Sequence, residues 1–258
     1  MRRLVLENNR GSATVHGSWA PAIRVCSDTP AAVTLRGNTL PGYDAVLDLG
    51  STTGELTVAD NTLRHLEFSS GFADTDPIQV SLTLRNNTLE TLKIRRQAAP
   101  LLVEGNTIGA AIFERSFASA VAGADVDNIQ GIVRGNTFTP VAAAPGITLG
   151  GAWQMLVEGN VIACQRTGER EFGLRVTPYA PEEGDAVTAS HNQIVGNTIR
   201  NCDVGINLYG YTGPVANNTV RDNILVNNNS SMWISYLVQN NLRACKSITP
   251  RIIRLTAT

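Results

Sequence analysis

A short frame built around asparagine recurs along the whole chain and constrains its fold more than any other feature. In each copy an apolar residue stands three places before the Asn, and Gly, Asp or Asn stands immediately before it. Repetition on this scale indicates a solenoid, in which each repeat packs on its neighbours. The ten frame asparagines are Asn9, Asn38, Asn61, Asn87, Asn106, Asn136, Asn160, Asn197, Asn223 and Asn241.

Each part of the frame has a mechanical role. Gly, Asp and Asn are the residues that best tolerate a left-handed backbone, which a sharp bend between two strands requires. The following Asn can then point into the coil and stack on its equivalents about 4.8 Å above and below. Its amide donates to one neighbour and accepts from the other, which avoids a cost of about 1–3 kcal/mol for each unpaired buried group. We therefore expect an asparagine ladder.

The spacing of the frames favours strands over helices. Successive frame asparagines lie 18 to 37 residues apart, and a coil of three short strands can lengthen one turn without disturbing the stack. Apolar and polar residues alternate on both sides of the bend, as in strands with one buried face. The best internal match overlays residues 192–199 on 218–225, and the two copies continue as Ile206-Asn207-Leu208 and Met232-Trp233-Ile234.

Segments such as 195–208 resemble the repeat of right-handed parallel β-helix proteins, the superfamily of pectate lyases, polygalacturonases, alginate epimerases and phage tailspikes. The resemblance covers about residues 4–245. It implies an all-β, right-handed parallel β-helix of about ten coils with an Asn ladder, roughly 45 Å long. A leucine-rich-repeat solenoid is the alternative, because residues 82–89 also satisfy its core motif, but the uneven spacing opposes it.

We expect a single domain over residues 1–258, with a long side loop around 163–191 and a C-terminal tail at 246–258. A β-helix exposes unpaired strand edges at its ends, and these are normally covered. The first frame begins close to Met1. We therefore expect a homo-oligomer or a preceding domain to cover that end.

Composition excludes some partners. A net charge of −1 argues against a general nucleic-acid binder, because neutralising phosphates requires clustered Lys and Arg. No apolar run approaches the ~18 residues of a membrane span. The first residues also lack the apolar region of a signal peptide. The chain is thus expected to be cytoplasmic if Met1 is its native start and secreted if a leader has been removed.

In this superfamily the substrate groove lies along one sheet, where outward residues of stacked strands form rows. Counting from the bends predicts one row of Asp48, Glu67 and Lys93, continued by Arg175, Asn207 and Trp233. A second row contains Ser69, Arg95 and Glu114. Two acids beside a lysine could bind a sugar carboxylate or a cation, or hold a base for β-elimination or epimerisation. The alternative is a solvated ladder of ion pairs that contributes little.

The remaining candidates are aromatic rings, histidines and cysteines. Tyr209, Tyr211 and Trp233 could stack on sugar rings, and His191 closes the long side loop. His16, His65 and His191 have no metal-site spacing and are expected to be surface or turn residues. Cys164 and Cys202 occupy similar places in consecutive coils, so their sulfurs are expected to stack. Because the chain has no C-x-x-C motif, we do not expect a zinc site, and we expect the cysteines to be buried thiols. We expect no cofactor, although a calcium ion is possible.

The motifs that carry catalysis in the related families are absent, including the Asp-Asp and Gly-His pairs of polygalacturonases and the Asp-Pro-His-Asp box of epimerases. Fold alone does not confer function. Our leading hypothesis is a carbohydrate-active enzyme, a lyase or epimerase on a uronate-containing or other polyhydroxylated oligosaccharide or polysaccharide. Two alternatives stay open: a non-catalytic scaffold, stalk or glycan-binding module, and an intracellular enzyme with another substrate. The site candidates are Lys93, Glu67, Asp48 and Arg175 for catalysis, and His191, Asn207, Tyr209, Tyr211 and Trp233 for substrate binding.

Overall fold

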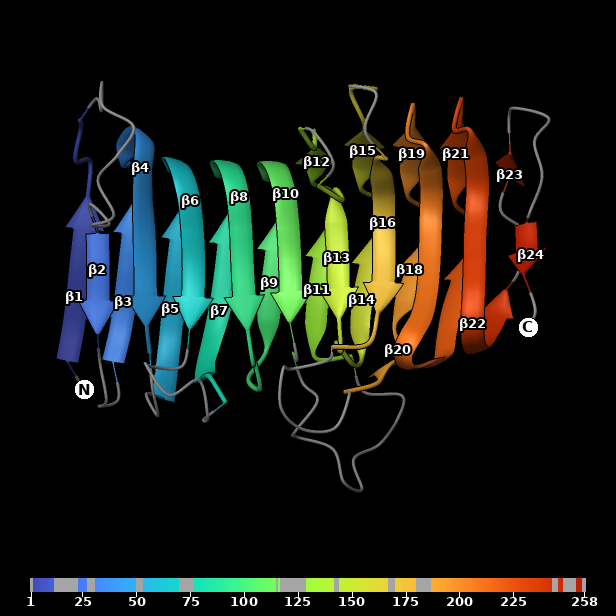
Figure 1. Ribbon diagram of the computed structural model, residues 1–258. Coiled ribbons are helices and arrows are strands. Elements are labelled where there is room, and N and C mark those ends of the chain that lie inside the picture. The colour runs from blue at the N-terminus through green and yellow to red at the C-terminus, as the bar shows by residue number, and fades with distance from the viewer. Residues whose placement is uncertain are drawn as a thin grey trace.

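A rod of stacked strands makes up the described part of the chain (Figure 1). The computed structural model describes residues 2–11, 23–26, 31–49, 53–69, 77–114, 116, 129–141, 144–166, 170–179, 187–242, 246–247 and 254–256. Within these ranges all strands pair in parallel with their counterparts one coil away, and no helix occurs. The parallel β-helix is therefore confirmed, and the leucine-rich-repeat alternative is wrong. With no helix among the described residues, none could cross a membrane.

The strands form three sheets that follow one another around each coil. The first sheet contains β1 (Arg2–Glu7), β3 (Ala31–Arg36), β5 (Thr53–Ala59), β7 (Gln79–Arg85), β9 (Leu101–Glu104), β11 (Gly131–Arg134), β14 (Met155–Glu158), β18 (Gln193–Val195) and the ends of β20 (Val204–Arg221) and β22 (Ser230–Leu242). The second, narrow sheet follows the Asn bend. It contains the starts of β4 (Thr39–Asp48), β6 (Thr62–Ser69), β8 (Thr88–Arg95) and β10 (Thr107–Glu114), then β12 (Thr137–Phe138), β15 (Val161–Ala163), β19 (Thr198–Arg200), β21 (Ile224–Val226) and β23 (Lys246–Ser247).

The third sheet carries most of the candidate site residues. It contains β2 (Ile23–Cys26), the later parts of β4, β6, β8 and β10, then β13 (Ile147–Gly150), β16 (Phe172–Thr177), the starts of β20 and β22, and β24 (Arg254–Thr256). A short strand, β17 (Ala189–Ser190), pairs with the middle of β20. The connection between the second and third sheets differs along the rod. In the N-terminal coils a single long strand runs from the second sheet into the third, whereas in the C-terminal coils two separate strands do so. The third sheet is continuous through both parts.

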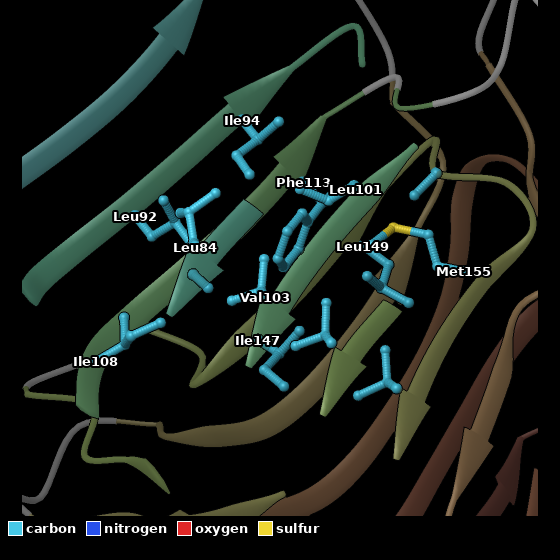
Figure 2. Close-up of a cluster of buried hydrophobic side chains, with 14 of the residues drawn as sticks. Leu84, Leu92, Ile94, Leu101, Val103, Ile108, Phe113, Ile147, Leu149 and Met155 are labelled. Atoms are coloured by element: carbon cyan, nitrogen blue, oxygen red, sulfur yellow. The ribbon is translucent and has the colours of Figure 1, made fainter. Parts of the chain in front are cut away.

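The core lies inside the coil and repeats from one coil to the next. Figure 2 shows side chains from different sheets, among them Leu84, Ile94, Phe113 and Met155, directed into the same interior. Each of these four is fully buried, and burying a side chain of this size contributes about 1.5–3 kcal/mol. Alternation along each strand leaves every second residue facing outward.

The asparagine ladder runs unbroken from Asn9 to Asn223. Asn106 is typical: its Nδ2 donates to Asn136 Oδ1 at 2.9 Å and to the carbonyl of Leu84 at 3.1 Å, while its backbone N–H donates to the same Oδ1 at 2.9 Å. Leu84 is the frame's apolar residue in the preceding coil. The residue before each of the nine ladder asparagines has a φ between 54° and 65°. The predicted roles of both frame positions are confirmed.

One frame was assigned to the wrong bend. Asn240, not Asn241, stacks, and it continues a second ladder from Asn192 through Asn218, with amide bonds of 2.8 and 2.9 Å. Asn241 pairs with Thr219 in the first sheet. The second bend also combines a left-handed residue with an inward Asn, as at Asn217 (φ 56°). The sequence frame therefore cannot distinguish the two bends.

The interval 163–191 is only partly a side loop. It contains β16, which stacks between β13 and β20 as part of the third sheet. Beyond it, Tyr179 and Val187 exchange two backbone hydrogen bonds of 2.9 and 2.7 Å in an antiparallel bridge. Residues 180–186, between the two residues of this bridge, lie outside the described residues.

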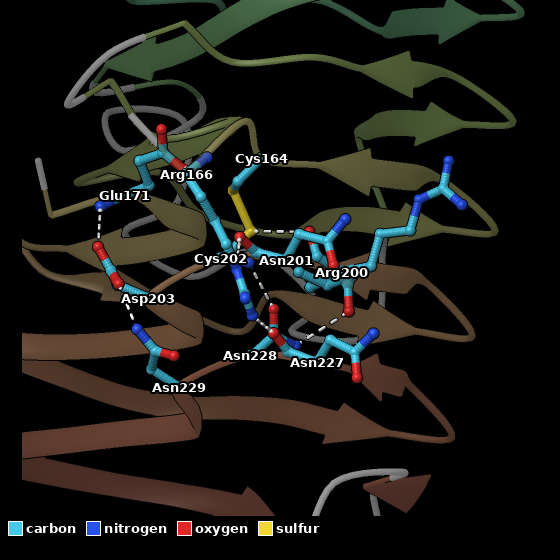
Figure 3. The surroundings of a disulfide bond; sticks show 11 residues. Cys164, Arg166, Glu171, Arg200, Asn201, Cys202, Asp203, Asn227, Asn228 and Asn229 are labelled. Carbon is cyan, nitrogen blue, oxygen red and sulfur yellow. Dashed lines mark hydrogen bonds between the residues drawn. A yellow bond between two sulfur atoms is a disulfide. The ribbon is translucent and has the colours of Figure 1, made fainter. Parts of the chain in front are cut away.

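Cys164 and Cys202 form a disulfide (Figure 3). Their Cα atoms lie 5.0 Å apart, as expected for equivalent positions in adjacent coils and within the range that a disulfide spans. The predicted stacking of the two sulfurs is confirmed, but the expectation of buried thiols is wrong for this pair. It is also wrong for Cys26, which is a free and exposed thiol. Cys245 and His16 lie outside the described residues.

Candidate functional site

The register of the third sheet assigns the outward rows. Glu67 pairs with Lys93, Arg175 with Asn207, and Asn207 with Trp233, so these members of the first row are confirmed. Ile112 and Thr148 fill the coils between Lys93 and Arg175. The predicted row is therefore one continuous line along the rod.

Asp48 does not belong to that line. Val46 pairs with Glu67, and Asp48 pairs with Ser69 in the second row, where Arg95 pairs with Glu114. The register shifts between Leu40 and Asp44 because β4 holds extra residues at its corner. Counting from the bend therefore misplaced Asp48 by two positions.

The N-terminal part of this face is a network of compensated charges. Arg95 Nε lies 3.1 Å from Glu114 Oε2 and 3.8 Å from Glu67 Oε1, and Lys93 Nζ lies 3.8 Å from Glu114 Oε2. Their side chains are 22–34% exposed. Both carboxylates thus face cations, as in the ion-pair ladder that was the alternative interpretation.

His65 belongs to the same network, and the sequence analysis missed it. Its Nε2 lies 3.4 Å from Glu67 Oε2, and its Nδ1 lies 2.9 Å from Thr91 Oγ1. The available signal was alternation, because His65 stands two residues before Glu67 on one strand and so shares its face. The hydrogen bond from His65 lowers the pKa of Glu67 against the opposing effect of burial, and the charges of Lys93 and Arg95 lower it further. A carboxylate held ionised in this way is a poor proton donor and a weakened base.

The C-terminal part of the same face is built differently. The Arg175 guanidinium carbon lies 4.9 Å from the ring centroid of Tyr209 and 5.5 Å from that of Phe172. Burial lowers the pKa of Arg175, opposed by the charge of Tyr209. Within the described chain no carboxylate forms an ion pair with Arg175, and its buried Nε has no hydrogen-bond partner there. The aromatic contacts supply attraction without neutralising the cation.

Two further polar atoms beside Arg175 lack partners. Asn207 and Ser235 occupy outward positions, yet they are only 2% and 4% exposed. Neither Asn207 Oδ1 nor Ser235 Oγ has a hydrogen-bond partner among the described residues. Asn207 lies between Arg175 and Trp233 in register, and Ser235 pairs with Tyr209. Buried polar atoms are normally paired, so this cluster has unused capacity for hydrogen bonds.

Aromatic rings border the cluster. The guanidinium carbon of Arg170 lies 4.7 Å from the ring centroid of Trp233. Tyr209 and Tyr211 stack with centroids 6.1 Å apart, and Tyr211 is 65% exposed. We name the group of Arg175, Asn207, Tyr209, Trp233 and Ser235 the Arg175 cluster. It unites four of the predicted candidates, with Tyr211 at its edge.

The corner that precedes the third sheet fixes the strands of the Arg175 cluster. Next to the disulfide, the backbone N–H of Glu171 donates to Asp203 Oδ2 at 3.0 Å, and Asn229 Nδ2 donates to Asp203 Oδ1 at 2.6 Å (Figure 3). A Cβ atom on Gly173 would lie 2.6 Å from the carbonyl oxygen of Gly205. The coils that carry Arg175, Asn207 and Trp233 are therefore cross-linked and closely packed immediately before these residues.

His191 lies at another corner. Its φ of 57° places it at the second bend, where its ring stacks on Trp153 with centroids 5.3 Å apart and its Nδ1 lies 3.2 Å from Ser190 Oγ. These contacts place His191 at the β17 corner, and its predicted role in substrate binding stays a prediction. In the described chain, no group of three or more His, Cys, Asp or Glu side chains could hold a metal ion.

Comparison with known proteins supports the fold assignment. A search of curated proteins finds no match. A family model described as "Right handed beta helix region" matches residues 25–246, which is most of the chain. The repeat, the ladder and the parallel sheets agree with that match. The chain belongs to the right-handed β-helix family.

Proposed function

We propose that this β-helix binds a uronate-containing oligosaccharide across the Arg175 cluster. The observation that carries the proposal is a half-buried arginine without a carboxylate partner in the described chain, beside two buried polar atoms that also lack partners. Guanidinium groups bind carboxylates in a bidentate geometry, and aromatic faces suit the apolar side of a ring. A uronate sugar offers a carboxylate for Arg175 and hydroxyls for Asn207 Oδ1 and Ser235 Oγ.

A lyase or epimerase reaction at the same cluster is the second candidate, favoured by a cation without a carboxylate partner in the described chain beside the unpaired Asn207 Oδ1 and Ser235 Oγ. Arg175 would neutralise the substrate carboxylate and so ease abstraction of the adjacent proton, because a guanidinium stays protonated in proteins. Lys93 and Glu67 stay predicted catalytic residues, but the ion pairs of Lys93 with Glu114 and of Glu67 with Arg95 favour a structural role. Asp48 lies in the other row and cannot assist Lys93 as first arranged.

The test compares Arg175 with Lys93 in calorimetric titrations with oligogalacturonate. Arg175→Ala should weaken binding at least about ten-fold, which corresponds to about 1.4 kcal/mol, because the carboxylate loses its only uncompensated cation in this cluster. Lys93→Ala should change affinity less than about two-fold, since Lys93 is already opposed by Glu114. Binding that survives Arg175→Ala, or that Lys93→Ala abolishes, would refute the proposal.

Catalysis has a separate readout. Incubation with uronate polymers should give either an unsaturated product that absorbs in the ultraviolet or incorporation of solvent deuterium, and Arg175→Lys should lose this turnover while keeping a cation. Binding without either signal would leave a glycan-binding module and remove the enzyme from consideration.

A further inference from the structure

A hollow of about 660 Å³ lies away from the Arg175 cluster, over the second sheet. Its lining comes from six consecutive coils, from Pro41 in β4 to Gln165 beyond β15. At about 4.8 Å per coil it is therefore roughly 24 Å long. A site of this size holds a ligand, and its length selects an elongated one.

A row of hydroxyl groups lines this hollow, which we name the threonine groove. Thr62, Thr88 and Thr107 pair in register on successive coils, and all three line the hollow together with Thr91. A hydroxyl both donates and accepts, so a row on three successive coils matches a ligand that carries hydroxyls along its length. Gly109, also in the lining, adds no side chain to the groove, and the close packing of its coil requires glycine, because a Cβ there would lie 2.3 Å from the carbonyl oxygen of Glu90.

The charge of the groove differs from that of the Arg175 cluster. Arg64 Nε and Nη2 each lie 2.8 Å from an oxygen of Asp44, so this guanidinium is neutralised. Glu90 is exposed, lines the groove, and forms no ion pair within the described residues, but its charge also acts on Arg64 and, after Asp44, helps to raise the pKa of that guanidinium. Arg64 therefore faces two carboxylates, Asp44 and Glu90, which leaves this side of the groove with a net negative charge.

We infer that the threonine groove binds an oligosaccharide that carries amino groups, of the glucosamine type. Its hydroxyls meet the threonine row, and an ammonium group meets Glu90. This site is independent of the uronate site, and its charge disfavours uronates. A hydrogen bond of 2.9 Å joins Thr91 Oγ1 in the groove wall to His65 Nδ1. A ligand that binds in the groove should therefore change the NMR signal of the His65 imidazole.

The experiment titrates the whole chain with a glucosamine hexamer, its N-acetylated counterpart and oligogalacturonate, by calorimetry and by NMR of the imidazole signals. The chain has 3 histidines, and His65→Gln assigns the one beside the groove. The glucosamine hexamer should bind more tightly than the acetylated one and shift the His65 signal but not that of His191. Added salt should weaken its binding, because salt screens an exposed ion pair.

Variants locate the site. Glu90→Gln should weaken the glucosamine hexamer about five-fold and remove most of the salt dependence, and Thr88→Val should weaken it about two-fold. The controls are Glu55→Gln, which removes an exposed carboxylate from the first sheet, and Arg175→Ala, which tests the uronate site. Neither should change binding in the groove. Equal binding of both hexamers, loss through Arg175→Ala, or no binding of the glucosamine hexamer would overturn the inference.

Discussion

Two parts of the third sheet, one around Glu67 and Lys93 and one around Arg175, share a row of outward residues but differ in whether their charged groups are paired. Around Glu67 and Lys93 each charged group meets an opposite charge within 4 Å, and His65 completes the set. Around Arg175 the cation meets aromatic rings, and neighbouring polar atoms stay unpaired within the described chain. Residue type alone would have favoured the first region, because it holds more ionisable groups.

The difference shows which arrangement leaves capacity for a ligand. A compensated network must break its own pairs before it can bind, and solvated pairs of this kind contribute about 0–1 kcal/mol each to stability. A half-buried arginine with unpaired neighbours has already lost part of its hydration, so a ligand that fills the site restores hydrogen bonds that folding removed. Binding is therefore expected where the protein leaves polar groups unmatched.

The largest expected effect is on stability, and it tests whether the disulfide holds the coils of the Arg175 cluster in place. It joins residues 38 positions apart directly behind the Arg175 cluster, and cross-linking a loop of this length stabilises by up to about 4 kcal/mol in the chain-entropy model. Replacing Cys164 and Cys202 together by Ala should lower the free energy of unfolding measured in urea by about 2–4 kcal/mol. Cys26→Ala is the matched control and should have little effect, since that thiol is free and exposed. An unchanged double variant would show that packing alone holds the C-terminal coils.

The next effect tests whether the two regions share one interior. Asn61 and Asn197 have equivalent partners: each Nδ2 donates to the next ladder Asn, to the apolar frame residue one coil back, and to the residue two places before it. Replacing either by Ala leaves donors of the preceding ladder Asn unpaired, so each should cost about 2–3 kcal/mol of unfolding free energy. Gln79→Ala, an exposed strand amide, should cost much less. Costs that differ widely between the two ladder variants would mean that the halves differ inside as well as outside.

Repetition made the fold predictable from the sequence. A bend residue with positive φ and a buried Asn are local requirements that each coil must meet separately, so nine copies of the frame report the same structure. The error at Asn241 has the same origin, because a second bend uses the same pair of residue types. Disulfide formation was not predicted, since it depends on the distance between two coils rather than on any local pattern.

The site was less predictable because it depends on register. Extra residues at the corner of β4 moved Asp48 into the other row, and nothing in a count from the bend reveals them. Asn207 and Trp233 were aligned correctly because they lie 26 residues apart, which is the offset of the best internal match. Arg175 lies 32 residues before Asn207, and the register of β16 confirms its place in the row. Whether a charge is compensated depends on rotamers and on neighbours in the adjacent coil. The ion-pair ladder around Lys93 was therefore only one of two interpretations of the sequence, and the isolation of Arg175 was not visible in it.

The smallest expected effect concerns the pH dependence of the compensated region. The pKa of Glu67 lies below its ordinary value of 4.5 in the folded chain, first because His65 hydrogen-bonds its carboxylate. A lowered pKa stabilises the fold at pH values above the unfolded pKa, and this stabilisation is lost as the pH falls through the folded value.

Glu67→Gln should therefore reduce stability near neutral pH by less than about 1 kcal/mol, because the side chain remains partly solvated. The difference between wild type and variant should shrink as the pH falls below 4.5. Urea midpoints measured from pH 7 to pH 3 provide the test, with Glu55→Gln as the exposed control. If the difference grows in acid, the ionised Glu67 carboxylate is not stabilised by its neighbours. The region around Glu67 and Lys93 would then not be a compensated network, and its contrast with the Arg175 cluster would be wrong.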